Sequence, residues 1–146
     1  MAIDILVVDD DNDDLALFIE ALNIVSPDAG CQTAVNGSGA IEYLSKSGSR
    51  HPAIIFLDIN MPVMNGWDCM SFLKSNPLYK DIPVIIYTTS STTADKEKAR
   101  AMSAFCFISK MQDFKSLKKM VEIVVRNLEK NAPHLICPEL HRMAET

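Results

Sequence analysis

The segment from Ala53 to Asp58 reads AIIFLD, and it decides the fold class of the chain. Its apolar residues follow one another without the alternation that marks a strand with one face in water. Continuous apolar runs of this length are typical of strands that are buried on both faces of a parallel sheet. The run stops abruptly at an acid, so we predict a buried strand that carries Asp58 to one edge of the sheet.

Four other segments are predicted strands, of which residues 30–35 are the weaker candidate, and each predicted strand is followed by apolar residues at helical spacing. The predicted strands comprise residues 3–8, 30–35, 53–57, 83–87 and 104–108. The predicted helices comprise residues 15–25, 40–45, 67–74, 92–102 and 114–128. Thr92 and Asp95 have the spacing of a capping box at the start of the fourth helix. This alternation predicts an α/β domain with helices on both faces of a parallel sheet.

Length and composition limit the function. The chain has 146 residues, which suits a single domain, and its formal net charge is −5. This charge argues against direct nucleic-acid binding, which requires a basic surface. The first residues lack the basic and apolar regions of a signal peptide, and we find no apolar run long enough to span a bilayer. We therefore expect a cytoplasmic protein with neither nucleic acid nor membrane as a direct partner.

Polar residues stand where four of the predicted strands end. They are Asp9, Asp10 and Asp11 after the first strand, Asp58 after the third, Thr88 at the fourth and Lys110 at the fifth. Ligands of open parallel sheets bind beyond the carboxyl ends of the strands. We therefore expect these side chains to converge on one site.

The residue types at this edge favour phosphoryl transfer. Clustered carboxylates repel one another, and Mg²⁺, which prefers oxygen ligands, removes that repulsion. A carboxylate can also attack phosphorus to form an aspartyl-phosphate. Asp58 stands alone at its strand end, so we interpret it as the nucleophile and the first-strand acids as metal ligands. The lysine and the hydroxyl would then neutralise charge on the transferred group.

These motifs together resemble the receiver domain of bacterial two-component response regulators, of the stand-alone type. The matching residues are Val7-Val8-Asp9-Asp10, Leu57-Asp58-Ile59-Asn60-Met61-Pro62 with Asn65-Gly66, Pro83-Val84-Ile85-Ile86-Tyr87-Thr88, and Lys110. The resemblance covers residues 3–130. It implies a flavodoxin-like, doubly wound fold with a five-stranded sheet in the order 2-1-3-4-5.

The resemblance also implies a role for each site residue. Asp58 would accept a phosphoryl group from a histidine kinase or a histidine phosphotransfer protein. Mg²⁺, or Mn²⁺ in its place, would be held by Asp9, Asp10, Asp58 and the backbone carbonyl of Asn60. Thr88 and Lys110 would contact the phosphoryl group, and Phe107 would move with Thr88 as the switch.

The resemblance further implies the domain limits and the output. Residues 1–130 would form the receiver, and residues 131–146, which contain two prolines and show no periodicity, would form a C-terminal tail without an effector domain. We expect the chain to catalyse only its own phosphorylation and dephosphorylation. Its output would then be contact with a downstream protein, which the sequence does not identify.

One position departs from the family pattern, because Met111 follows Lys110 where the family usually has proline after a cis bond. A cis bond costs about 2.5–4 kcal/mol before a residue other than proline. We therefore predict a trans bond, with the Lys110 ammonium still within salt-bridge reach of Asp58.

Three other interpretations of the acidic motif carry less weight. Asp9 and Asp11 match the opening of an aspartate-nucleophile phosphohydrolase, but the Gly-Thr pair that usually follows is absent. The same acids fit part of a calcium EF-hand loop, but Asp14 stands where that loop requires glycine. A flavin-binding module would need a Ser/Thr/Gly-rich phosphate loop after the first strand, and the chain has none there.

The cysteines and histidines give no sequence signal of a site. The four cysteines are far apart in the chain and form no C-x-x-C motif: Cys31, Cys69, Cys106 and Cys137. We predict buried free thiols in a reducing compartment. The three histidines have no partner at metal-binding spacing, and we expect them at the surface: His51, His134 and His141.

Overall fold

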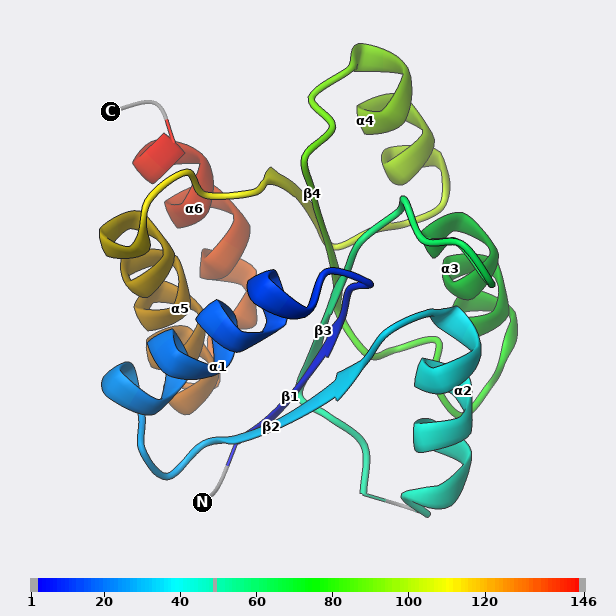
Figure 1. The fold of residues 1–146 in the computed structure, drawn as a ribbon, viewed down its shortest axis with the longest axis horizontal. Coiled ribbons are helices and arrows are strands. Elements are labelled where there is room, and N and C mark those ends of the chain that lie inside the picture. Colours follow the sequence, from blue (N-terminus) through cyan, green and yellow to red (C-terminus); the bar gives the residue numbers. More distant parts are fainter. Residues whose placement is uncertain (1–2, 49, 145–146) are drawn as a thin grey trace.

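The computed structural model describes residues 3–48 and 50–144, and these form one parallel sheet with helices on both faces. The strands are β1 (Asp4–Val8), β2 (Gly30–Ala34), β3 (Ile54–Leu57), β4 (Val84–Thr88) and β5 (Cys106–Ser109). Their order is β2-β1-β3-β4-β5, and every neighbouring pair is parallel. The predicted fold class and strand order are therefore confirmed (Figure 1).

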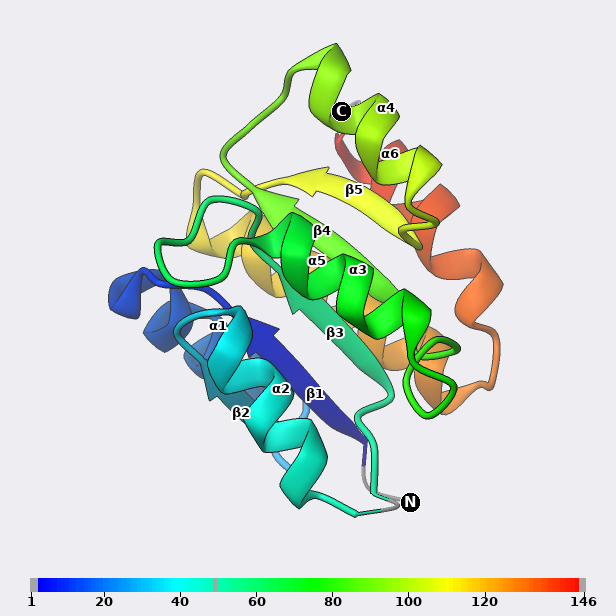
Figure 2. The same cartoon turned by 90° about the vertical axis from the view of Figure 1, so that its right-hand side faces the viewer.

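Helices cover both faces of the sheet, as Figure 2 shows. They are α1 (Asn12–Val25), α2 (Gly37–Lys46), α3 (Gly66–Ser75), α4 (Thr93–Ala101) and α5 (Phe114–Glu129), and a sixth helix is described below. Successive strand residues point to opposite faces, so β1 supplies Ile5 to the core under α1 and α5 and Leu6 to the core under α2 and α3. Both faces of the central strands are buried, which explains their unbroken apolar sequence.

Side-chain caps fix where the helices begin. Asp11, Asn36, Asn65, Thr92 and Asp113 each accept a hydrogen bond from a backbone N–H in the first turn of the helix that follows. Such caps satisfy N–H groups that have no partner within the helix. Thr92 Oγ1 accepts from the Asp95 N–H at 3.1 Å, which is one half of the predicted capping box, whereas the Asp95 carboxylate accepts from the Ser90 hydroxyl and not from the Thr92 N–H. The caps therefore fix the points at which the loops at the carboxyl edge of the sheet pass into helices.

The C-terminal segment corrects the sequence analysis, which found no periodicity after residue 130. Pro133–Leu135 forms the 3₁₀ turn η1, and Ile136–Ala144 forms helix α6. Ile136 and Leu140 are fully buried in the core with α5, and Glu139 pairs with Arg126 at 2.6 Å. The apolar pair has helical i, i+4 spacing, but the helix is short and a proline in its first turn obscured the pattern.

The prediction of four free thiols was wrong for two of them. Cys106 and Cys137 form a disulfide that joins β5 to α6, because α6 folds back and brings together residues 31 positions apart. Cys31 and Cys69 are free, and burial raises the pKa of both thiols to about 11.

Of the histidines, His134 and His141 are exposed as expected, whereas His51 is half-buried against the Tyr79 ring. No described helix has the length and apolar character needed to cross a membrane.

Candidate functional site: an acidic pocket at the carboxyl edge of the sheet

Three of the four acids predicted to converge do so, and the fourth, Asp11, caps α1 instead. The carboxylates of Asp9, Asp10 and Asp58 each place one oxygen within 4.8 Å of the others. Asp9 and Asp58 are only 3% and 6% exposed, whereas Asp10 is open to solvent. Backbone hydrogen bonds extend the sheet past the strand ends and fix the two buried acids, with the Asp9 N–H donating to the Ala34 carbonyl at 3.0 Å and the Asp58 N–H donating to the Val8 carbonyl at 2.9 Å.

Lys110 brings a positive charge to this acidic cluster. Its ammonium nitrogen lies 2.7 Å from Asp9, 2.7 Å from Asp14 and 3.2 Å from Asp58. The predicted salt-bridge reach to Asp58 is therefore confirmed. The lysine side chain is only 12% exposed, so these contacts lie in a largely desolvated pocket, where charges interact more strongly than in water.

Asp14 is the residue of this pocket that the sequence analysis missed. It lies in the first turn of α1, whose cap at Asp11 turns it toward Lys110. The helix dipole favours an acid in the first turn of any helix, so the presence of Asp14 there was no signal of a site. Its partner is 96 residues away, so no local pattern could identify the ion pair.

Burial and ion pairing set the protonation of the pocket. Burial raises the pKa of Asp9 above its ordinary value of 3.8, and the hydrogen bond from Lys110 counteracts only part of this effect. Burial alone would lower the pKa of Lys110, but hydrogen bonds to Asp14 and Asp9 and the charge of Asp58 together raise it. The ammonium of Lys110 thus stays charged, but three acids share this one positive charge. The negative charge of Asp9, the most buried of the three, is therefore only partly neutralised. A divalent cation would supply the missing positive charge.

Thr88 and Phe107 lie beside the pocket on adjacent strands. Thr88 is fully buried, and its hydroxyl accepts a hydrogen bond from the Ser90 N–H at 3.4 Å. Phe107 pairs with Ile86 across β4 and β5, so it lies on the same face of the sheet as Thr88. It is half-buried against the core under α2 and α3. The two predicted switch residues are therefore neighbours on one face.

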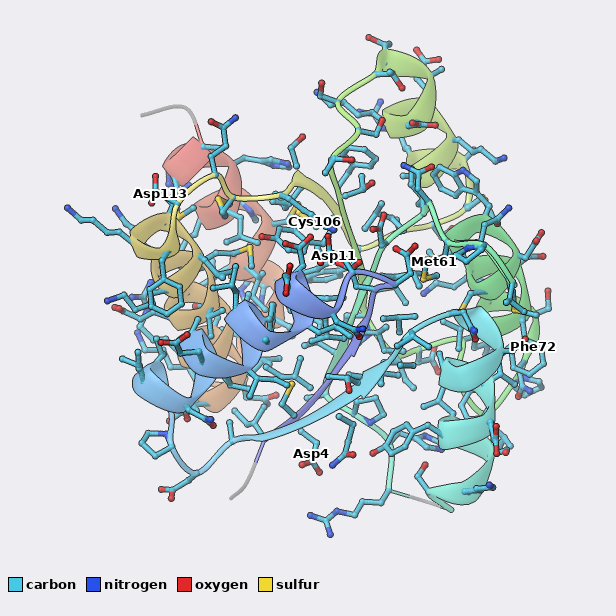
Figure 3. The ribbon with its side chains drawn as sticks, viewed as in Figure 1. Asp4, Asp11, Met61, Phe72, Cys106 and Asp113 are labelled. Carbon is cyan, nitrogen blue, oxygen red and sulfur yellow. A yellow bond between two sulfur atoms is a disulfide. The ribbon has the colours of Figure 1, made fainter. Side chains whose placement is uncertain are left out.

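The loop after β3 holds the predicted acceptor in place. The Asn60 N–H donates to Asp58 Oδ1 at 3.1 Å, and the Gly66 N–H donates to the Ile59 carbonyl at 3.2 Å. Gly66 also touches this loop directly, because a Cβ at this position would lie 2.6 Å from the Ile59 Cα. Met61, labelled in Figure 3, is a buried residue of this loop, and Asp11, labelled there too, caps α1.

The Lys110–Met111 bond is trans, because no peptide bond of the described residues is cis. The Met111 N–H donates to the Tyr87 hydroxyl at 3.0 Å. A proline at this position would lack that N–H. Met111 therefore makes a hydrogen bond that the usual proline could not make. Its partner, Tyr87, lies on β4, the strand that also carries Thr88.

Asp11 has a different part from the one that a phosphohydrolase would give it. Its carboxylate accepts from the N–H groups of Asp13 and Asp14 at 2.9 and 3.1 Å, which caps α1. The same geometry disagrees with an EF-hand loop, because α1 begins at Asn12, so that Asp14, at the position which that loop gives to glycine, lies inside a helix. Both interpretations also use the Asp11 carboxylate, which caps the helix here.

Comparisons with known proteins identify the family. The model of the response regulator receiver domain matches residues 5–122, so the chain belongs to this family. The response regulator Rcp1 of Synechocystis is 32% identical over 122 residues, covering 81% of this chain and 83% of that protein.

Solved structures agree with this assignment. The phosphorylated cyanobacterial phytochrome response regulator RcpA has a TM-score of 0.79 at 27% identity, over 87% of this chain and 94% of that one. The Mn²⁺-bound form of Rcp1 has a TM-score of 0.73 at 30% identity, over 83% and 90%. Receiver domains bind Mg²⁺ or Mn²⁺ at an acidic pocket, and the cluster of Asp9, Asp10 and Asp58 forms such a pocket here.

Proposed function

We propose that this chain is a phosphorylation-dependent signalling switch whose acceptor is Asp58. The observation that carries the proposal is the convergence of Asp58, the acidic cluster and Lys110 in one pocket. The ammonium of Lys110 lies 3.2 Å from the Asp58 carboxylate, and the oxygens of the acidic cluster lie within 4.8 Å of one another. The donor is a phosphohistidine on a histidine kinase or a phosphotransfer protein.

The reaction is an in-line displacement at phosphorus. A carboxylate oxygen of Asp58 forms the new O–P bond, the N–P bond of the phosphohistidine breaks, and the imidazole leaves with the bonding electrons. Asp9, Asp10, Asp58 and the Asn60 carbonyl would hold Mg²⁺ or Mn²⁺, which would supply positive charge to the phosphoryl oxygens. Lys110 neutralises further charge on the phosphoryl group, and the Thr88 hydroxyl donates a hydrogen bond to it.

Phosphorylation would then change the face of the protein that carries Phe107. The Thr88 hydroxyl moves toward the phosphoryl group, and Phe107 follows into the space that this movement leaves. Such a two-state element needs only a difference in contacts between the two states to shift its population. Output is by contact with a downstream protein in the cytoplasm, and the chain acts catalytically only on its own phosphorylation and dephosphorylation. The receiver is residues 1–130, with the remainder as a C-terminal extension.

The experiment is incubation with acetyl phosphate and Mg²⁺, followed by intact-mass measurement. We expect one phosphoryl mass on the wild-type chain and none on Asp58→Asn. Asp28→Asn, which changes an exposed acid outside the pocket, is the matched control and should accept the group normally. Normal labelling of Asp58→Asn, together with loss of labelling in Asp9→Asn, would instead favour the phosphohydrolase interpretation.

A further inference from the structure

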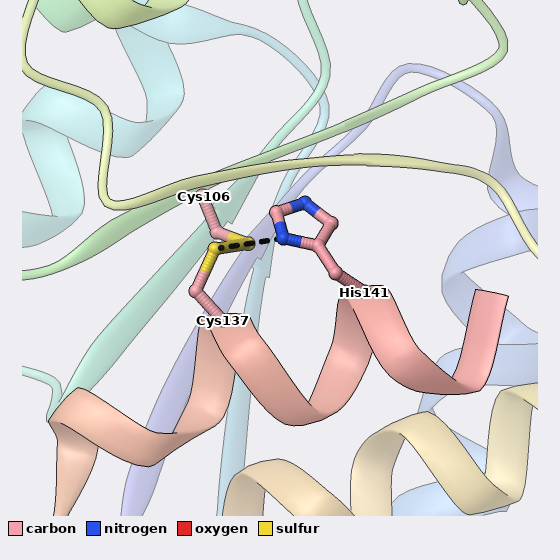
Figure 4. A group of neighbouring side chains, drawn as sticks. All are labelled: Cys106, Cys137 and His141. Carbon is pink, nitrogen blue, oxygen red and sulfur yellow. Dashed lines mark hydrogen bonds between the residues drawn. A yellow bond between two sulfur atoms is a disulfide. The ribbon is translucent and has the colours of Figure 1, made fainter. Parts of the chain in front are cut away.

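The switch described above makes no use of the disulfide between Cys106 and Cys137. This bond fastens α6 to β5, and Cys106 is the residue before Phe107 (Figure 4). Cys106 is 4% exposed in the core under α5, whereas Cys137 is only half-buried. The two sulfurs therefore differ in access, as an attacking and a resolving thiol do.

The surroundings of Cys137 favour the thiolate form that attacks oxidants. Cys137 is the second residue of α6, near the end of the helix whose dipole favours an anion. His141 lies one turn later, and its Nδ1 is 3.7 Å from Cys137 Sγ. His141 is exposed, as predicted, but its ring also contacts the Cys137 sulfur.

The pair is reachable from solvent. A pocket of about 1030 Å³ lies between α4, β5, α5 and α6, and Cys106, Cys137 and His141 all line it. Lysines and an arginine of α4 and α5 line its other walls: Lys96, Arg100, Lys115 and Lys119. A small oxidant can therefore reach the sulfurs without unfolding of the helix.

We propose that Cys137 and Cys106 form a reversible redox site that takes a hydroperoxide. The Cys137 thiolate attacks the terminal peroxide oxygen, the O–O bond breaks, and the alkoxide or hydroxide leaves and takes up a proton, which gives a sulfenic acid. The Cys106 thiol then attacks this sulfur and displaces water, which leaves the disulfide. A dithiol reductant reverses the reaction by two exchange steps and is itself oxidised to a disulfide.

The state of this site controls how firmly α6 covers β5. In the reduced chain α6 keeps only non-covalent contacts, chiefly buried Ile136 and Leu140 and the pair of Glu139 with Arg126. In the oxidised chain the bond ties the start of α6 to the strand that bears Phe107. The proposal stands on these contacts and does not depend on phosphorylation of Asp58.

The test begins with the full chain, reduced and freed of reductant, to which hydrogen peroxide is added. We expect a loss of two hydrogen masses, mapping to a Cys106–Cys137 peptide pair. Cys106→Ser should stop at a sulfenic acid on residue 137 that dimedone traps, Cys137→Ser should react far more slowly, and Cys31→Ser should behave as wild type. Dimedone adducts at Cys31 in place of the disulfide would overturn the proposal. So would a reduced chain that binds one equivalent of Zn²⁺ through these residues and resists peroxide.

His141 is a positioning residue in this proposal, and its part is tested by rate. His141→Ala should slow disulfide formation about threefold, because a tenfold loss of thiolate is partly offset by greater nucleophilicity. His141→Asn keeps an N–H donor near the position of Nδ1 and should restore most of the rate. Amide exchange in residues 136–144 should quicken on reduction, while exchange in β1 stays unchanged. Equal rates in all three chains, or equal exchange in both redox states, would refute the assignment.

Discussion

The loop that carries Asp58 depends on the absence of a side chain at Gly66, and Gly66→Ala tests this. The new Cβ would lie 2.6 Å from the Ile59 Cα and still closer to the Asp58 carbonyl oxygen. Both obstacles are backbone atoms, so no side-chain rotation relieves the contact. Either α3 or the acceptor loop must move.

The magnitude follows from two opposing effects. Overpacking of a tight contact costs about 1–3 kcal/mol. Replacing glycine by alanine in a helix returns at most about 1 kcal/mol. We therefore expect a net loss of about 1–2 kcal/mol in the free energy of unfolding, or roughly 3–8 °C in Tm for a domain of this size. Displacement of Asp58 should also slow phosphorylation by acetyl phosphate about tenfold, because reacting groups tolerate little misplacement.

Gly39→Ala is the matched control, since Gly39 also lies in the first turn of a helix. Its Cβ would meet Ala34 and Asn36 at 3.5 Å, which is ordinary contact. This variant should be as stable as the wild type or slightly more so, with normal phosphorylation. Thermal unfolding by circular dichroism and intact-mass time courses give both quantities. Equal Tm values and labelling rates for Gly66→Ala and Gly39→Ala would show that the acceptor loop does not require glycine at position 66.

Three further predictions concern the pocket and its surroundings. Burial raises the pKa of Asp9, and metal binding needs its carboxylate in the ionised form. The affinity for Mg²⁺ should therefore be constant at neutral pH and should begin to fall, as the pH drops, above pH 3.8, the pKa of an ordinary aspartate. The affinity can be measured by Mg²⁺ titrations followed by Trp67 fluorescence, and an affinity that stays constant down to pH 3.8 would contradict this prediction. Thr88→Ala should keep phosphorylation of Asp58 but lose most of the accompanying change in the NMR signals of Phe107. A full change in these signals would show that Phe107 responds to phosphorylation independently of the Thr88 hydroxyl. Tyr87→Phe removes the partner of the Met111 N–H and should cost about 1 kcal/mol in urea unfolding, and an unchanged midpoint would show that this hydrogen bond contributes nothing.

The sheet and most of the pocket could be predicted because their signals are local. The strand before Asp58 is apolar throughout because both of its faces are buried, and its end is marked by the acid itself. Parallel topology then places all strand ends at one edge, so residues as distant as Asp9 and Lys110 could be grouped without knowledge of their contacts.

What the sequence did not reveal depends on partners far along the chain. Asp14 matters only because Lys110 reaches it, and the spacing of Cys106 and Cys137 does not report that α6 folds back onto β5. The fully buried residues of α6 are Ile136 and Leu140, with Cys137 and Met143 partly buried beside them, and a pattern this short does not distinguish a helix from a tail. The ion pair, the disulfide and the packing of α6 depend on tertiary contacts, which local sequence propensity does not report.

The most direct test of the central claim is the identity of the residue that carries the phosphoryl group. The chain is phosphorylated with acetyl phosphate and Mg²⁺, treated with borohydride, which reduces an aspartyl-phosphate to homoserine, and digested for peptide mass mapping. We predict homoserine at position 58 and nowhere else in the chain. Homoserine at position 9, or a phosphorylated chain without homoserine at any position, would contradict it.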